Sequence, residues 1–125
     1  MNIPLVWAAS LLALFTFCVH TFVGGKSVAR PLLADQRLPA ISKWLNYMCW
    51  HMTTIMLLWC AVALAIAAWQ PQLHMLVALI AGLAGVCSVW SAAVAKMAGF
   101  HPMRLPSTYL LGGLAALCVS ALTVG

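Results

Sequence analysis

The chain has 125 residues, and only 6% of them are charged while 66% are hydrophobic. A soluble domain carries about 25% charged residues, so this composition excludes a soluble globular domain. The formal net charge of +5 would suggest nucleic acid in a soluble protein. In a chain this apolar, membrane lipids are the expected partners, with anionic headgroups at the basic loops and no nucleic acid.

Four apolar stretches are each long enough to cross a bilayer, which takes about 20 residues. They cover roughly residues 4–23, 44–69, 73–96 and 107–124. Gly24 and Gly25 are expected to end the first stretch, and the Gln70–Gln72 turn separates the second from the third. The sequence therefore predicts an all-α polytopic membrane protein with a single domain, a four-transmembrane-helix bundle.

The segment from Lys26 to Lys43 mixes basic and apolar residues. Pro31 and Pro39 argue against one continuous helix through it, because proline cannot donate a helical hydrogen bond and its ring clashes with the preceding turn. Two interpretations stay open. The segment is either a short amphipathic stretch in the headgroup region or a solvated loop.

All Lys and Arg residues lie in or beside the first and third connections. They are Lys26, Arg30, Arg37, Lys43, Lys96 and Arg104. Cytoplasmic loops of membrane proteins carry an excess of these residues. The sequence therefore predicts that these two connections are cytoplasmic and that both termini lie on the outer face.

Histidines are the main candidates for a functional site, because ionisable groups within a membrane are rare and usually functional. His20 and His51 fall near the cytoplasmic ends of their spans, at similar depth, and His101 lies in the cytoplasmic connection between the last two. Together they predict a site for b-type haem or for iron, copper or zinc. Hydrogen-bonded packing or proton transfer are the alternatives. His74 lies at the opposite interface and is expected to be a polar anchor.

Several side chains near His51 could support such a site. They are Tyr47, Thr54, Met48, Met52 and Cys49. Thioethers spaced four residues apart can bind Cu(I), although methionine is also a common filler of cores. The five cysteines contain no C-x-x-C pair and indicate no disulfide framework.

Small residues recur at helix-packing spacing in the last two spans. Ala78, Gly82, Ala81 and Gly85 do so in the third span, and Gly112, Ala116 and Ser120 in the fourth. Such faces let helix backbones approach closely in lipid. We expect the third span to pack on the fourth through them, the alternative being a seam between copies in a homo-oligomer.

Three short motifs resemble a family of small bacterial four-helix inner-membrane proteins of unassigned function. They are H-x-x-x-G at His20, W-H-x-x-T at Trp50 and H-P at His101. The resemblance covers the whole chain and implies location in the bacterial inner membrane and a common role for the three histidines. Gly25 stands where that family often has an acidic residue, so no acid-dependent chemistry is implied.

Three functions follow from these patterns. The first is a ligand-binding membrane protein that holds a metal ion or haem in a histidine-lined polar pocket on the cytoplasmic side. The second is an accessory subunit that packs on a larger membrane complex. The third is a small transporter, but no span contains the carboxylate that proton coupling requires. An enzyme stays open, because a histidine-bound metal with a free position can be catalytic.

Overall fold

The computed structural model describes residues 1–124, in which all regular secondary structure is helical and there is no strand. Its elements are α1 (Ile3–Cys18), a wide-turn π-helix η1 (Val19–Ala29), α2 (Arg30–Ala34), α3 (Ala40–Trp69), η2 (Pro71–Leu73), α4 (His74–Met97), η3 (Pro102–Arg104) and α5 (Pro106–Thr123). Four stretches are long and apolar enough to span a membrane: Ile3–Ala34, Ala40–Trp69, Pro71–Met97 and Pro106–Thr123. The predicted four-span, all-α membrane fold is confirmed.

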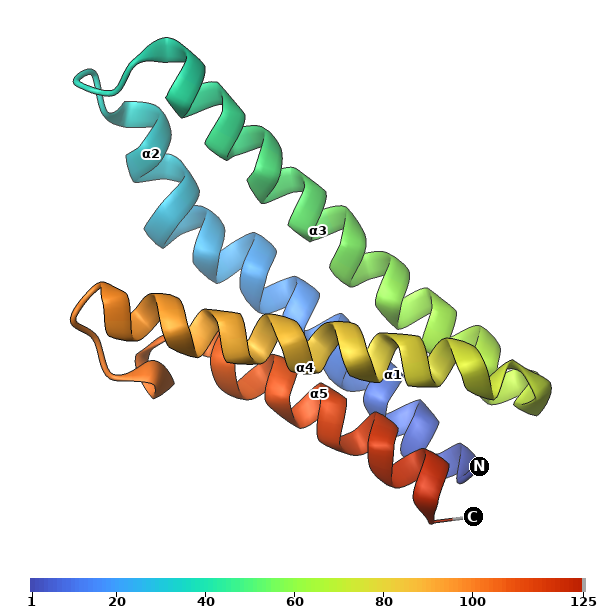
Figure 1. The fold of residues 1–125 in the computed structure, drawn as a ribbon. Coiled ribbons are helices and arrows are strands. Elements are labelled where there is room, and N and C mark those ends of the chain that lie inside the picture. The colour runs from blue at the N-terminus through green and yellow to red at the C-terminus, as the bar shows by residue number, and fades with distance from the viewer. Residues whose placement is uncertain (125) are drawn as a thin grey trace.

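The helices form two antiparallel hairpins (Figure 1). The first consists of α1, η1 and α2 running against α3, and the second consists of α4 against α5. The hairpins are joined mainly through α1 and α5, whereas α3 and α4 touch little although they are consecutive. The backbone N–H of Asn2 donates to the carbonyl of Ala121 at 2.7 Å, so both termini lie at one end of the molecule. We call this the terminal end.

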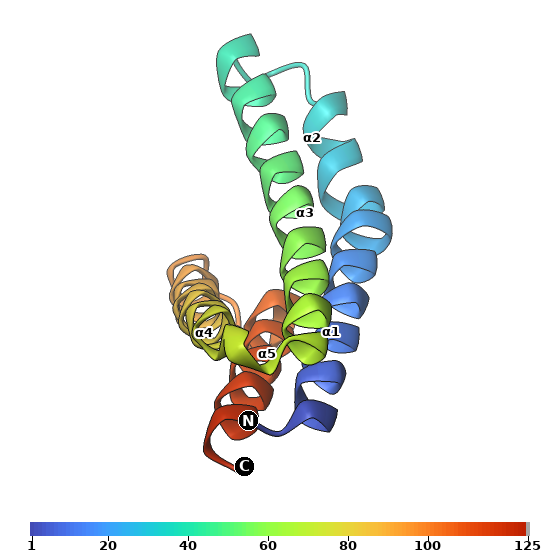
Figure 2. The same ribbon diagram turned by 90° about the vertical axis from the view of Figure 1, so that its right-hand side faces the viewer.

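We call the opposite end the basic end, because all six Lys and Arg residues lie toward it. The first hairpin is longer than the second: α3 has 30 residues and α5 has 18. At 1.5 Å per residue these helices are about 45 Å and 27 Å long. Figures 1 and 2 show the tip of the first hairpin standing clear of the loop between α4 and α5.

The first helix does not end at Gly24 and Gly25, contrary to the sequence-based prediction. It widens into η1 and continues through Pro31 to Ala34, so the connection to α3 shrinks to residues 35–39. In η1 the N–H of Arg30 donates to the carbonyl of Gly25, five residues back. The wider turn moves the preceding carbonyls away from the ring of Pro31, which explains why this proline does not break the helix.

The end of this long helix is tied to α3. Lys43 Nζ donates to the carbonyl of Leu33 at 3.2 Å, and so satisfies one of the carbonyls that a helix C-terminus leaves free. Ala29 is buried. These tertiary contacts hold the segment helical although its composition suggests a loop.

The hydrophobic core lies in the terminal half of the bundle. Its buried residues come from 6–13 of α1, 61–68 of α3, 77–84 of α4 and 114–121 of α5. Eight of these fourteen residues are alanines, and small side chains let helices approach closely in lipid. The hairpins are therefore packed together at the terminal end and diverge toward the basic end (Figures 1 and 2).

The small residues of α4 divide between two faces. A β-carbon on Gly85 would lie 3.8 Å from Ala115, and one on Gly112 would lie 3.1 Å from Ser88 Oγ. The expected close packing of the third span on the fourth is confirmed at these positions. Gly82 was expected at the same seam, but nothing lies within 4 Å of its β-carbon position. It faces outward from the pair.

Candidate functional site

A cavity of about 400 Å³ lies where the two hairpins diverge. Its walls come from α1 and η1, from the middle of α3, and from the start of α5 and the residue before it, with one residue of α4. We call it the wedge cavity. It is lined by Thr16, Val19, His20, Val23, Gly24, Ser27, Val28, Trp50, Thr53, Met56, Leu57, Cys87, Leu105, Pro106, Ser107, Leu110 and Leu111.

His20 and Trp50 form one aromatic pair in the wall of the wedge cavity. Their ring centroids are 3.9 Å apart and their planes differ by 18°. His20 Nε2 also lies 3.3 Å from the carbonyl oxygen of Trp50. This pair joins η1 to α3 at the level where α5 begins, since Ser107 lines the same cavity.

Gly24 completes the pair. One helical turn after His20, it leaves the room that the indole of Trp50 occupies: a β-carbon there would lie 2.6 Å from Trp50 Cη2. Two of the short motifs noted in the sequence, H-x-x-x-G and W-H, therefore meet in space. Their first histidine, their glycine and their tryptophan form a single packing unit.

The other histidines lie elsewhere. His51 follows Trp50 and so shares the level of His20, but it is exposed, and its ring is perpendicular to that of Tyr47 at a centroid distance of 4.5 Å. His101 is exposed in the α4–α5 loop, where its Nδ1 accepts from the N–H of Met103 at 3.3 Å. His74 is exposed at the terminal end. Only His20 lines the wedge cavity.

The remaining sequence-based candidates lie on several sides of α3. Thr54 Oγ1 donates to the carbonyl of Trp50 at 3.1 Å. Met48, Cys49 and Met52 are exposed on the surface of α3, so they do not face the cavity, whereas Met56 does. Among residues 1–124, no three His, Cys, Asp or Glu side chains are grouped so that they could hold a metal ion.

Several cavity residues were not proposed as site residues from the sequence. Ser27, Gly24 and Trp50 line the cavity together with Leu110 and Leu111. His20, Gly24 and Ser27 follow a helical spacing of four and three residues, which places them on one face. That signal was hidden because the helix was expected to end at Gly24.

Toward the basic end of the second hairpin, hydrogen bonds of hydroxyl groups link α4 to the start of α5. Ser91 Oγ lies 2.6 Å from Ser107 Oγ and 2.9 Å from Thr108 Oγ1, and Ser88 Oγ donates to the Thr108 carbonyl at 2.6 Å. In lipid such polar groups need partners within the protein. This cluster fixes the start of α5, which forms one wall of the wedge cavity.

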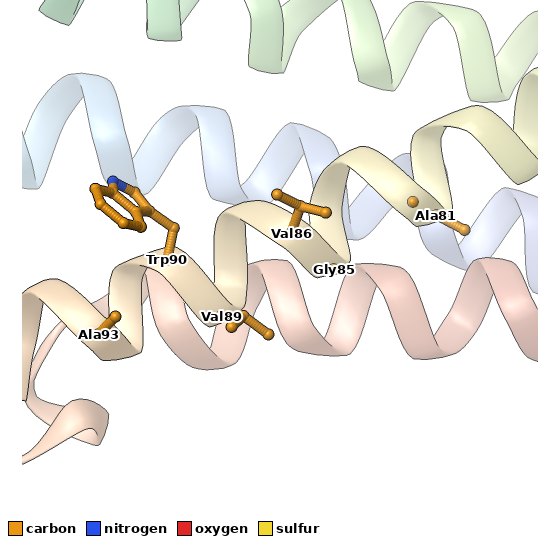
Figure 3. A pocket seen from close by; sticks show the side chains of 7 residues that line it. Ala81, Gly85, Val86, Val89, Trp90 and Ala93 are labelled. Carbon is orange, nitrogen blue, oxygen red and sulfur yellow. The ribbon is translucent and has the colours of Figure 1, made fainter.

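A second hollow runs along the outer face of α4 (Figure 3). It is an open groove lined by Ala81, Gly82, Gly85, Val86, Val89, Trp90 and Ala93. Its lining is apolar and belongs to one helix, as expected for a surface in contact with lipid chains. The wedge cavity, with its few polar groups among apolar walls, has the composition of a ligand site.

Comparisons of the chain with protein-family models, curated proteins and solved structures found no match.

Proposed function

We propose that this chain is a ligand-binding protein that holds a small lipid-like molecule in the wedge cavity. One observation supports this above all: the hairpins pack tightly at the terminal end and leave an apolar cavity of about 400 Å³ at the other. Ligand sites combine apolar walls with a few placed polar groups. Trp50 and Ser107 line the side of the cavity nearer the basic end, where we place the ligand's head, so the ligand's chain would point to the terminal end.

Filling the cavity tests this proposal. Leu111→Trp adds bulk at the cavity wall, while Leu79→Trp adds the same bulk on an exposed face of α4. Both proteins would be purified from membranes in mild detergent, and the small molecules that accompany them extracted and identified by mass spectrometry. We expect a lipid-like molecule in near-stoichiometric amount with the wild type and Leu79→Trp, and a severalfold loss with Leu111→Trp. Equal content in all three would contradict the proposal.

We also propose that the protein resides in the bacterial inner membrane with its basic end in the cytoplasm. The support is the location of the six Lys and Arg residues at one end of the bundle and both termini at the other. A reporter that is active only in the cytoplasm should show no activity when it is fused to the C-terminus. The same reporter inserted at Gln36, in the turn between α2 and α3, should be active.

Metal or haem binding is the second candidate function, because His20 and His51 share one level of the bundle. An absorption spectrum and metal analysis of the purified protein distinguish it. A Soret band that disappears in both His20→Ala and His51→Ala would favour haem. A colourless metal that is present in stoichiometric amount in the wild type and lost in both variants would favour zinc or Cu(I). With neither, and with no lipid-like molecule, an accessory subunit of a larger membrane complex becomes the better hypothesis.

A further inference from the structure

The walls of the wedge cavity carry no charged side chain. Six lining residues have polar side-chain groups: Thr16, His20, Ser27, Trp50, Thr53 and Ser107. Lys26 precedes Ser27 in the chain but does not line the cavity. An anionic head such as a phosphate or carboxylate would therefore enter the cavity without a cation to pair with, and burying an unpaired charge is costly.

Three of the four wall hydroxyl groups already use their protons. Thr16 donates to the carbonyl of Leu12 at 2.7 Å, Ser27 to that of Val23 at 3.0 Å, and Thr53 to that of Cys49 at 3.1 Å. Ser107 shares its hydroxyl with Ser91. A hydroxyl that donates elsewhere can still accept. Thr16, Ser27 and Thr53 therefore offer a ligand acceptor oxygens rather than donors.

His20 also offers an acceptor atom, because the proton of its ring is engaged elsewhere. The carbonyl of Trp50 can only accept, so the 3.3 Å contact requires the proton of the neutral imidazole on Nε2. Nδ1 then carries the lone pair, and within residues 1–124 it has no hydrogen-bond partner. The indole Nε1–H of Trp50 is the one lining side-chain N–H donor that is not engaged within those residues.

We propose that the wedge cavity selects an uncharged amphiphile with a hydroxyl head, such as a long-chain or isoprenoid alcohol or a quinol. Its O–H donates to His20 Nδ1, and its oxygen accepts from the Trp50 indole. This inference rests on the proposed function, since it names the head group of the ligand that the cavity binds.

A set of ligands that differ only at the head tests the inference: 1-dodecanol, dodecyl methyl ether and dodecanoate. Binding to the purified protein would be followed by the shift in melting temperature across a concentration series. We expect dodecanol to bind roughly tenfold more tightly than the ether, the effect of one hydrogen bond of about 1.4 kcal/mol. Dodecanoate at neutral pH should bind more weakly still.

Two variants test whether His20 causes the preference for the alcohol over the ether. His20→Phe keeps an aromatic ring against Trp50 but removes Nδ1, and should bind alcohol and ether alike, while His74→Phe should behave as wild type. Equal affinity for all three heads in the wild type would overturn the hydroxyl inference and leave the proposed function standing. Absence of binding by every ligand, together with no effect of Leu111→Trp on co-purified lipid, would overturn both.

Discussion

A β-carbon on Gly24 would lie 2.6 Å from Cη2 and 3.0 Å from Cζ2 of Trp50, so the indole fills the space that any other residue at position 24 needs. The same indole stacks on His20, which lies one helical turn before Gly24. The three residues are therefore interdependent. A change at the glycine moves the tryptophan, and a moved tryptophan releases the histidine.

Gly24→Ala should lower the free energy of unfolding by about 1–3 kcal/mol, because a methyl group added to filled space forces the indole out of place. Gly25→Ala is the matched control, since nothing lies within 4 Å of its β-carbon position. Thermal unfolding in one detergent measures both. The Trp50→Phe change, which shortens the ring, should partly restore Gly24→Ala. If both alanine variants melt alike, the packing of Trp50 on Gly24 is wrong.

Gly112→Leu should separate α4 from α5, since a β-carbon there already lies 3.1 Å from Ser88 Oγ. We expect a loss of more than 2 kcal/mol, because bulk at a close helix contact cannot be relieved by a small shift. Gly82→Leu adds the same bulk where nothing is near and should leave the melting temperature almost unchanged. A damaging Gly82→Leu would show that a second copy or partner covers the α4 groove.

Thr21 Oγ1 is the one buried side-chain polar atom in residues 1–124 that lacks a hydrogen-bond partner. Thr21→Val removes this unsatisfied hydroxyl with little change in shape, so it should stabilise the protein by about 1 kcal/mol. Thr16→Val, on the same helix, removes a hydroxyl that donates at 2.7 Å and should be neutral or slightly destabilising. A melting temperature of Thr21→Val below that of Thr16→Val would show that the Thr21 hydroxyl does have a partner.

The turn between α2 and α3 carries the one acid of the chain. Arg37 donates to Asp35 from its side chain at 3.2 Å and from its backbone at 2.8 Å, and so lowers the pKa of that carboxyl. A group with a lowered pKa stabilises the folded state above its unfolded pKa, about 3.9 here. The contribution disappears as the pH falls through the lowered value.

Asp35→Asn should therefore melt slightly below the wild type at pH 7, and the two should converge as the pH falls through the lowered pKa of Asp35. The difference is small because the pair is exposed. Raising the salt concentration at pH 7 should also narrow it. A difference that is unchanged at low pH would mean that the asparagine alters the turn itself rather than removing a charge.

The four spans and the common side of the termini could be predicted from the sequence, because a low content of charge and runs of about 20 apolar residues leave few alternatives. The continuation of the first helix could not. Gly24, Gly25 and Pro31 each favour a break locally, and the contacts that override them, such as Lys43 with the carbonyl of Leu33, join residues ten apart.

The wedge cavity was beyond sequence reasoning for a different reason. His20 and His51 could be placed at one level from helix lengths, but the rotation of each helix about its axis could not. That rotation directs Trp50, rather than His51, onto His20. It also turns Met48 and Met52 outward while Met56 faces the cavity. Small differences in the rotation of a helix about its axis decide which of several adjacent polar residues belong to a site.

The pairing of α1 with α5 has a consequence for how the protein is made. Of the four spans described here, α1 precedes the others in the chain and packs on α5, which follows them, and the backbone bond from Asn2 to Ala121 joins the ends of these two helices. The first hairpin can enter the membrane before the second, but its face toward α5 has no partner within the bundle until α5 has been synthesised. Assembly of the bundle is thus a late, post-insertional step, and a chain truncated before α5 lacks one wall of the cavity.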